Sequence, residues 1–117
     1  MVYLIDDDES VRRAFTLFLN SANIDHQTFK TADDFLSAFK QDEKDLLVLD
    51  LNLPGMKGID LLKELKAMDA PLTIIVVTAN DEPNNRDYCK KFGVKAYLRK
   101  PVDAEALLDI INYNISK

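Results

Sequence analysis

The most constraining feature of this sequence is a regular alternation of short apolar runs with amphipathic segments along all 117 residues. Three of the runs are continuous and mostly aliphatic, as is typical of strands buried on both faces of a sheet: residues 2–5, 46–49 and 72–77. Two weaker runs, residues 24–30 and 95–98, contain polar residues or are very short, and we predict that they form edge strands.

Helical patterns lie between the predicted strands. Apolar residues recur at three- and four-residue spacing over 11–22, and Asp8, Glu9 and Ser10 before them favour a helix start. Thr31 is placed to cap a second helix, and a third pattern covers residues 59–68. Asp103 is predicted to cap a fifth helix, which carries the apolar residues Leu107, Leu108, Ile111 and Ile115.

The fourth helical segment, residues 82–92, is different. Its apolar residues are only Tyr88, Cys89 and Phe92, and Gly93 is placed to end it. A helix with so narrow an apolar face gains little from packing on a sheet, so we expect a loosely held fourth helix. Cys89 is interpreted as a small apolar filler rather than a reactive thiol.

Five strands alternating with five helices predict an α/β fold with a parallel sheet and helices on both faces, in one domain over residues 1–117. With the two weak strands at the edges, the strand order is 2-1-3-4-5, a doubly wound, flavodoxin-like (βα)5 arrangement. In such sheets the ligand site lies beyond the carboxyl ends of the strands where the order reverses, here between strands 1 and 3.

Polar residues follow four of the predicted strands at that edge: Asp6 and Asp7, Asp50, Thr78 and Lys100. Carboxylates 4 Å apart repel by about 4 kcal/mol at an effective dielectric constant near 20, so a positive group is expected among them. Mg²⁺, which prefers oxygen ligands, and the Lys100 ammonium are the two candidates.

Each of these residues alone has a simpler interpretation. Asp6 and Asp7 could be helix-start residues, Asp50 could open the turn at Pro54-Gly55, and Lys100 could be a solvated charge. The coincidence of acids, a hydroxyl and a lysine at four strand ends is what favours a site.

Composition limits the partners. The net charge is −5, so the domain is not expected to bind nucleic acid directly. No apolar run approaches the ~20 residues of a membrane span. One cysteine and the absence of a signal-peptide pattern favour a cytoplasmic location.

Four stretches, spread from the first strand to the last helix, carry a family resemblance: Leu4-Ile5-Asp6-Asp7-Asp8-Glu9, Leu49-Asp50-Leu51-Asn52-Leu53-Pro54-Gly55-Met56-Lys57-Gly58, Val77-Thr78-Ala79 and Leu98-Arg99-Lys100-Pro101. On these residues the chain resembles a bacterial two-component response regulator receiver domain. The ordered set is far more specific than any one stretch, and no compared position departs from the family pattern.

The resemblance implies that Asp50 accepts a phosphoryl group from a phosphohistidine on a sensor histidine kinase or a phosphotransfer protein. It implies Mg²⁺ bound by Asp7, Asp50 and the backbone carbonyl of Asn52, with Asp6 acting through water. Such a domain is not an enzyme on other substrates, because it catalyses only its own phosphorylation and dephosphorylation.

The resemblance also assigns roles in signalling. Lys100 would pair with Asp50 and then with the phosphoryl group, next to a cis bond to Pro101, and Thr78 would hydrogen-bond another phosphoryl oxygen. Tyr97 would turn into the space that Thr78 vacates. The face formed by helix 4, strand 5 and helix 5 would then change, and it would also be the surface of any homodimer.

Two further implications concern lifetime and output. Asn52 and Asn80 match positions that tune how long the phosphoryl group survives. Transcription regulation through a further domain is the expected output, since many receiver domains are attached to DNA-binding domains.

Three other functions share parts of the pattern. A haloacid-dehalogenase-like phosphatase would need a second Asp where this chain has Asn52. A flavodoxin-like electron carrier would need a loop rich in Ser, Thr and Gly where this chain has Asp6-Asp7-Asp8-Glu9. A pure interaction module would not need Asp50, Thr78 and Lys100 together.

Overall fold

The computed structural model describes residues 1–40, 45–79 and 82–115. Its strands are β1 (Val2–Ile5), β2 (His26–Phe29), β3 (Leu46–Leu49), β4 (Thr73–Thr78) and β5 (Ala96–Arg99). Its helices are α1 (Glu9–Ser21), α2 (Ala32–Ala38), α3 (Gly58–Ala67), α4 (Pro83–Lys91) and α5 (Ala104–Ile115). Within the described residues, no helix combines the length and the apolar character that crossing a membrane requires.

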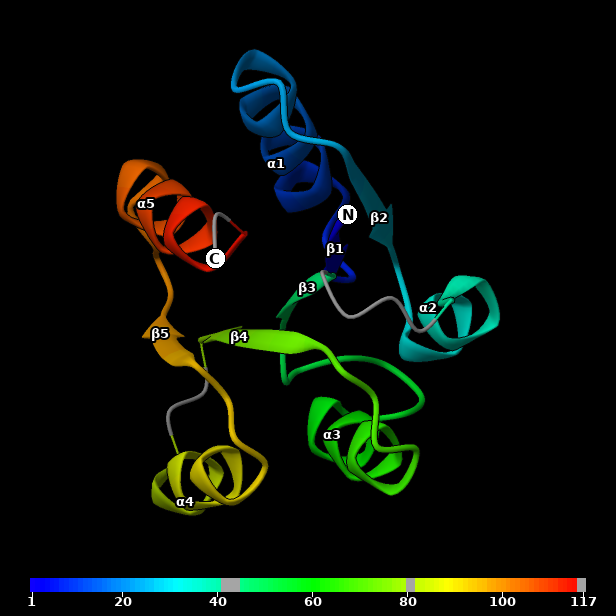
Figure 1. Ribbon diagram of the computed structural model, residues 1–117. Coiled ribbons are helices and arrows are strands. Elements are labelled where there is room, and N and C mark those ends of the chain that lie inside the picture. Colours follow the sequence, from blue (N-terminus) through cyan, green and yellow to red (C-terminus); the bar gives the residue numbers. More distant parts are fainter. Residues whose placement is uncertain (41–44, 80–81, 116–117) are drawn as a thin grey trace.

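The five strands form one parallel sheet in the order β2-β1-β3-β4-β5, so the predicted fold class and strand order are confirmed. Helices α1 and α5 cover one face of the sheet, and α2, α3 and α4 cover the other (Figure 1). The carboxyl ends of β1 and β3 lie level, because the Asp50 N–H donates to the Ile5 carbonyl oxygen at 3.1 Å.

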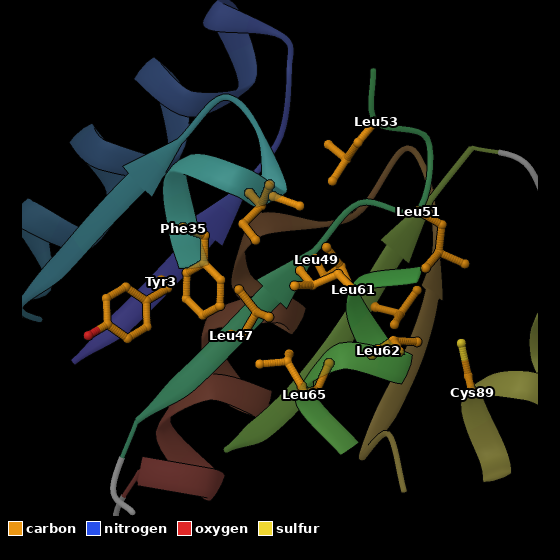
Figure 2. Packing of buried hydrophobic residues seen from close by; sticks show 14 residues of the cluster. Tyr3, Phe35, Leu47, Leu49, Leu51, Leu53, Leu61, Leu62, Leu65 and Cys89 are labelled. Carbon is orange, nitrogen blue, oxygen red and sulfur yellow. The ribbon is translucent and has the colours of Figure 1, made fainter. Parts of the chain in front are cut away.

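The central strands alternate their side chains between two apolar layers. Tyr3 and Ile5 of β1 pack toward α2 and α3, whereas Val2 and Leu4 pack toward α1 and α5. All residues of β1 and β3 are buried, as the continuous apolar runs predicted. The layer beneath α2 and α3 is rich in leucine and in the rings of Tyr3 and Phe35 (Figure 2).

Several element ends differ from the predicted ones by one or two residues. Strand β2 begins at His26 rather than at residue 24, because the Ile24 N–H still donates to the Leu19 carbonyl at the end of α1. Strand β4 is shifted by one residue and includes Thr78. Met68, which we predicted on the apolar face of the third helix, follows α3 and is exposed, and Leu61 is buried instead.

The predicted helix caps are present. The Asp8 side chain accepts a hydrogen bond from the Ser10 N–H at the start of α1, and the Thr31 hydroxyl oxygen accepts one from the Asp34 N–H at the start of α2. Helix α4 ends before Gly93, whose φ of +73° lies in the left-handed region that favours glycine.

Candidate functional site

The three acids predicted at the ends of β1 and β3 come together. A carboxylate oxygen from each of Asp6, Asp7 and Asp50 lies within 4.8 Å of the others. Asp6 and Asp50 are buried, and Asp7 is exposed to solvent. The parallel strands bring the acids together, because residues that directly follow two level, adjacent strands lie side by side.

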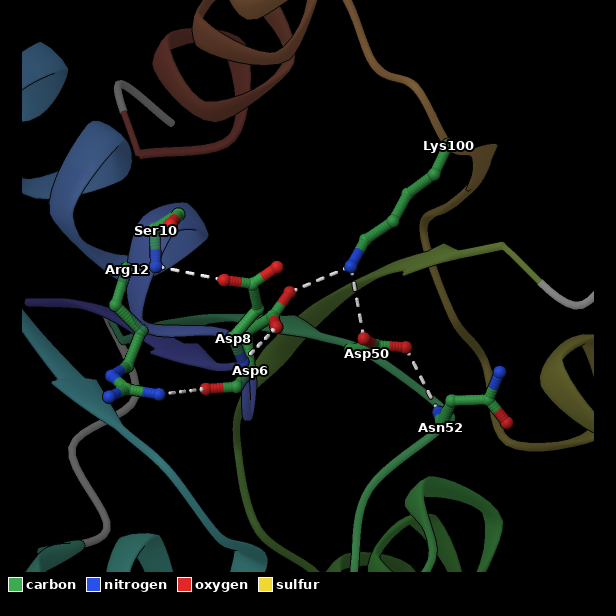
Figure 3. Close-up of polar contacts among 7 residues, drawn as sticks. All are labelled: Asp6, Asp8, Ser10, Arg12, Asp50, Asn52 and Lys100. Atoms are coloured by element: carbon green, nitrogen blue, oxygen red, sulfur yellow. Dashed lines mark hydrogen bonds and ion pairs between the residues drawn. The ribbon is translucent and has the colours of Figure 1, made fainter.

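Lys100 reaches into this acidic cluster from the end of β5. Its Nζ donates to Asp6 Oδ2 at 2.8 Å and to Asp50 Oδ2 at 3.0 Å (Figure 3). The Lys100 N–H donates to the Thr78 carbonyl oxygen at 2.9 Å, which holds the lysine beside the end of β4. The Lys100–Pro101 peptide bond is cis, as the resemblance implied.

Backbone groups hold the two buried carboxylates in place. Asp50 Oδ1 accepts a hydrogen bond from the Asn52 N–H at 2.9 Å, and Asp6 Oδ1 accepts one from the Asp8 N–H at 2.9 Å. Each carboxylate therefore has one oxygen on a backbone amide and the other on Lys100. Both side chains keep a fixed orientation without blocking every lone pair.

The electrostatics of the cluster leave it short of positive charge. Burial raises the pKa of Asp50 above its ordinary value of 3.8, and the Asn52 N–H and Lys100 only partly oppose this effect. Burial alone would lower the pKa of Lys100, but its hydrogen bonds and charge contacts with Asp6 and Asp50 outweigh burial and raise it. Lys100 is therefore cationic at neutral pH, and the acids can accept a further cation.

The donor set fits Mg²⁺. Asp6, Asp7 and Asp50 offer carboxylate oxygens within a few ångströms of each other, which are the hard ligands that Mg²⁺ binds. The exposed side of Asp7 leaves room for the waters that Mg²⁺ retains. Asn52 lies two residues after Asp50 in the loop after β3, and its side chain is exposed.

Thr78 and Tyr97 lie on one face of the sheet. Tyr97 pairs with Val76 in the register of β4 and β5, and Thr78 lies two residues beyond Val76 on the same face. Thr78 is fully buried, and Tyr97 is half-buried beside α4. Asn80, the other residue predicted to tune phosphoryl lifetime, lies outside the described residues.

Three contacts around the site were not foreseen from the sequence. Arg12 of α1 donates from Nη1 to the Asp6 carbonyl oxygen at 2.8 Å. Gly58 lies so close to Leu51 that a Cβ at this position would come within 2.6 Å of the Leu51 Cα. The Arg86 guanidinium lies over the ring of Tyr97. Only Gly58 had a sequence signal, because it ends the matched stretch after Asp50.

Curated proteins similar to this chain include transcription regulators. The transcriptional regulatory protein FixJ of Azorhizobium caulinodans is 30% identical over 116 residues, which cover 99% of this chain and 55% of that protein. The DNA-binding transcriptional regulator NtrC of Klebsiella pneumoniae is 29% identical over 99% of this chain and 25% of its own length. The chain thus spans about half, or less, of the length of these relatives.

Solved structures agree with the fold. The response regulator StyR superposes with a TM-score of 0.90 at 35% identity, over 98% of this chain and 58% of that chain. A response regulator receiver protein from Pseudomonas putida superposes with a TM-score of 0.86 at 31% identity, over 96% of this chain and 94% of that chain. Because the family model described as "Response regulator receiver domain" matches residues 2–112, this chain belongs to the response regulator receiver domain family.

Proposed function

We propose that residues 1–117 form one receiver domain in which Asp50 accepts a phosphoryl group from a phosphohistidine. The observation that supports this most strongly is the meeting of Asp6, Asp7, Asp50 and Lys100 at one edge of the sheet. The donor is a sensor histidine kinase or a phosphotransfer protein, because the family receives its phosphoryl group from such partners. The reaction takes place in the cytoplasm.

In the transfer, a carboxylate oxygen of Asp50 forms a bond to phosphorus while the bond from phosphorus to the donor imidazole nitrogen breaks. The electron pair of the broken bond stays on the imidazole. The hydrogen bond from the Asn52 N–H orients the Asp50 carboxylate for this attack. Asp50 acts on no other substrate, so the chain catalyses only its own phosphorylation and dephosphorylation.

The remaining groups neutralise charge. Asp7, Asp50 and the Asn52 carbonyl oxygen would hold Mg²⁺ directly, and Asp6 would hold it through water. When bound, Mg²⁺ offsets negative charge on the phosphoryl oxygens and on the acids. Lys100, already 3.0 Å from Asp50, would pair with a second phosphoryl oxygen, and the Thr78 hydroxyl would donate to a third.

Phosphorylation would act through Thr78 and Tyr97. Movement of Thr78 toward the phosphoryl group leaves space on the face of β4 that Tyr97 shares, and the Tyr97 ring can occupy it. The surface of α4, β5 and α5 would then change, and this surface would also serve a homodimer. Asn52 and Asn80 would tune the phosphoryl lifetime, and the output would be transcription, as the names of FixJ and NtrC suggest.

The test is incubation with acetyl phosphate and MgCl₂, followed by intact-mass spectrometry. One phosphoryl group should be added to the native chain, and none after Asp50→Asn or in excess chelator. Asp45→Asn is a matched control, because Asp45 is another buried carboxylate, at the opposite end of β3, and it should leave the adduct unchanged. An adduct that survives Asp50→Asn would disprove the assignment.

Lys100→Ala tests the second assigned residue. It should leave the fold intact but lower the rate of phosphorylation and weaken the conformational response, because no other described cation lies within ion-pair distance of Asp50. Normal phosphorylation with a normal response in this variant would remove Lys100 from the mechanism.

A further inference from the structure

The ring of Tyr97 is directed at α4 and not at α5. Its neighbours on β5, Ala96 and Leu98, pack in the layer beneath α1 and α5, whereas Tyr97 packs in the opposite layer. The Tyr97 hydroxyl oxygen is buried, although the side chain as a whole is only half-buried. The Tyr97 ring thus lies inward, beneath α4.

Arg86 of α4 contacts this ring. Its guanidinium carbon lies 4.8 Å from the centroid of the Tyr97 ring, inside the roughly 6 Å range in which a cation is attracted to an aromatic face. Arg86 is itself exposed, so the contact belongs to the weaker class of such interactions. It nevertheless joins α4 directly to the residue proposed to report on Thr78.

The contact between Arg86 and the Tyr97 ring matters because α4 has few buried residues. Cys89 is the single residue of α4 that is buried, as the sequence of this segment predicted. Because one small side chain supplies the buried apolar contact of α4, a second contact that shifts the equilibrium between docked and open α4 by a few-fold makes a large contribution to docking.

We propose that Arg86 is a positioning residue for Tyr97: its guanidinium holds the ring inward and thereby holds α4 against β5. The regulatory consequence rests on the proposed function of Asp50. If phosphorylation favours the inward ring, Arg86 already populates part of that state, and by linkage it makes phosphorylation easier.

The first test does not need phosphorylation. Cys89 is the chain's single cysteine and is buried in α4, so its rate of modification by a thiol reagent under native conditions reports how often α4 opens. Arg86→Gln should raise this rate about two- to fivefold, as expected for loss of an exposed cation–π contact. Arg86→Lys should restore part of the protection, because it keeps a cation.

Two comparisons separate this role from a general effect on α4. Lys95→Gln removes the same charge from an exposed position near α4 but outside the helix, and it should leave the rate nearly unchanged. In a Tyr97→Leu background the effect of Arg86→Gln should disappear, whereas in Tyr97→Phe it should persist because the ring remains. An equal effect of Arg86→Gln with and without the ring would overturn the proposal, and so would no effect at all.

The second test measures the consequence. At limiting acetyl phosphate with MgCl₂, Arg86→Gln should lower the initial phosphorylation rate about two- to fivefold, with partial rescue by Arg86→Lys and none of this loss in Lys95→Gln. An unchanged rate would overturn the regulatory part of the proposal. If the native chain takes up no phosphoryl group, the proposed function fails, and the Cys89 measurements still decide whether Arg86 positions Tyr97.

Discussion

Helices α3 and α4 lie next to each other on one face of the sheet, with 10 and 9 residues, yet they are attached in different ways. Helix α3 buries four of its residues, Gly58, Leu61, Leu62 and Leu65. Helix α4 buries only Cys89. Figure 2 shows the α3 leucines within the apolar cluster and Cys89 at its margin.

The difference separates a fixed support from a movable element. Helix α3 begins where the loop after Asp50 ends, and the close approach of Gly58 to Leu51 joins the helix to that loop. Helix α4 is attached largely through contacts near the surface, such as Arg86 over the Tyr97 ring. We therefore expect changes in α3 to alter global stability and changes in α4 to alter local opening.

The largest effect is expected for Leu62→Ala in α3. Leu62 is fully buried, and removing its side chain should lower the free energy of unfolding by about 2–5 kcal/mol, measured by urea denaturation. Leu17→Ala is the control, because Leu17 is 66% exposed and its loss should cost under about 0.5 kcal/mol. Equal costs for the two variants would mean that α3 does not support the core.

Gly58→Ala should be the next largest. The added Cβ would meet the Leu51 backbone at 2.6 Å, so α3 or the loop after Asp50 must move, at a cost of about 1–3 kcal/mol. The displaced loop should also slow phosphorylation by acetyl phosphate. Gly55→Ala is the matched control for Gly58→Ala. Gly55 has a φ of +70° but open space where a Cβ would lie, so this variant tests backbone strain alone. If Gly55→Ala slows phosphorylation as much, strain in the loop and not the contact with Leu51 is responsible.

Much of this contrast could be predicted from the sequence. The apolar runs at 2–5 and 46–49 specified β1 and β3 at their observed bounds, because strands buried on both faces need no polar alternation. The short apolar face of residues 82–92 predicted the weakly buried α4. The convergence of Asp6 and Asp50 followed from the strand order alone.

The remaining contacts depend on side-chain directions that no periodicity specifies. Arg12 was one polar residue among several on α1, and only the crossing of α1 over β1 brings its guanidinium to the Asp6 carbonyl. Arg86 and Tyr97 belong to different elements whose relative rotation decides whether they meet. Long charged side chains reach several neighbours, so their partners follow from the tertiary structure and not from spacing.

Cys89→Ala should have a smaller and pH-dependent effect. Burial raises the pKa of Cys89 from 9.0 to about 11. The buried neutral thiol therefore stabilises docked α4 fully below pH 9, and this stabilisation is lost as the pH rises from 9 toward 11. The variant should cost about 1 kcal/mol at pH 8, and the cost should shrink above pH 9. Thermal melts of both proteins between pH 8 and 10.5 measure it. A cost that stays constant over this range would mean that Cys89 leaves its buried site before it ionises.

The smallest effect is expected for Lys66→Gln, at the contact between the two helices. Lys66 of α3 donates from Nζ to the Lys91 carbonyl oxygen at 3.1 Å, at the C-terminal end of α4, and its ammonium lies over the Phe92 ring. A cation at a helix C-terminus contributes about 0.3–1 kcal/mol when exposed, so α4 opening should rise by about two- to fivefold while the urea midpoint hardly changes.

Because Lys66 belongs to α3, this variant asks directly whether the fixed helix holds the movable one. Modification of Cys89 by a thiol reagent measures the opening. Lys63→Gln is the matched comparison, since the Lys63 ammonium lies over the Tyr88 ring of α4 but makes no described hydrogen bond to that helix, so its effect should be smaller than that of Lys66→Gln. High salt should reduce the effect of Lys66→Gln, because the contact is exposed and charged. Lys66→Gln could instead lower the free energy of global unfolding by as much as it lowers the free energy of α4 opening. In that case α4 would unfold with the rest of the domain, and the two helices would not differ in the way that their burial indicates.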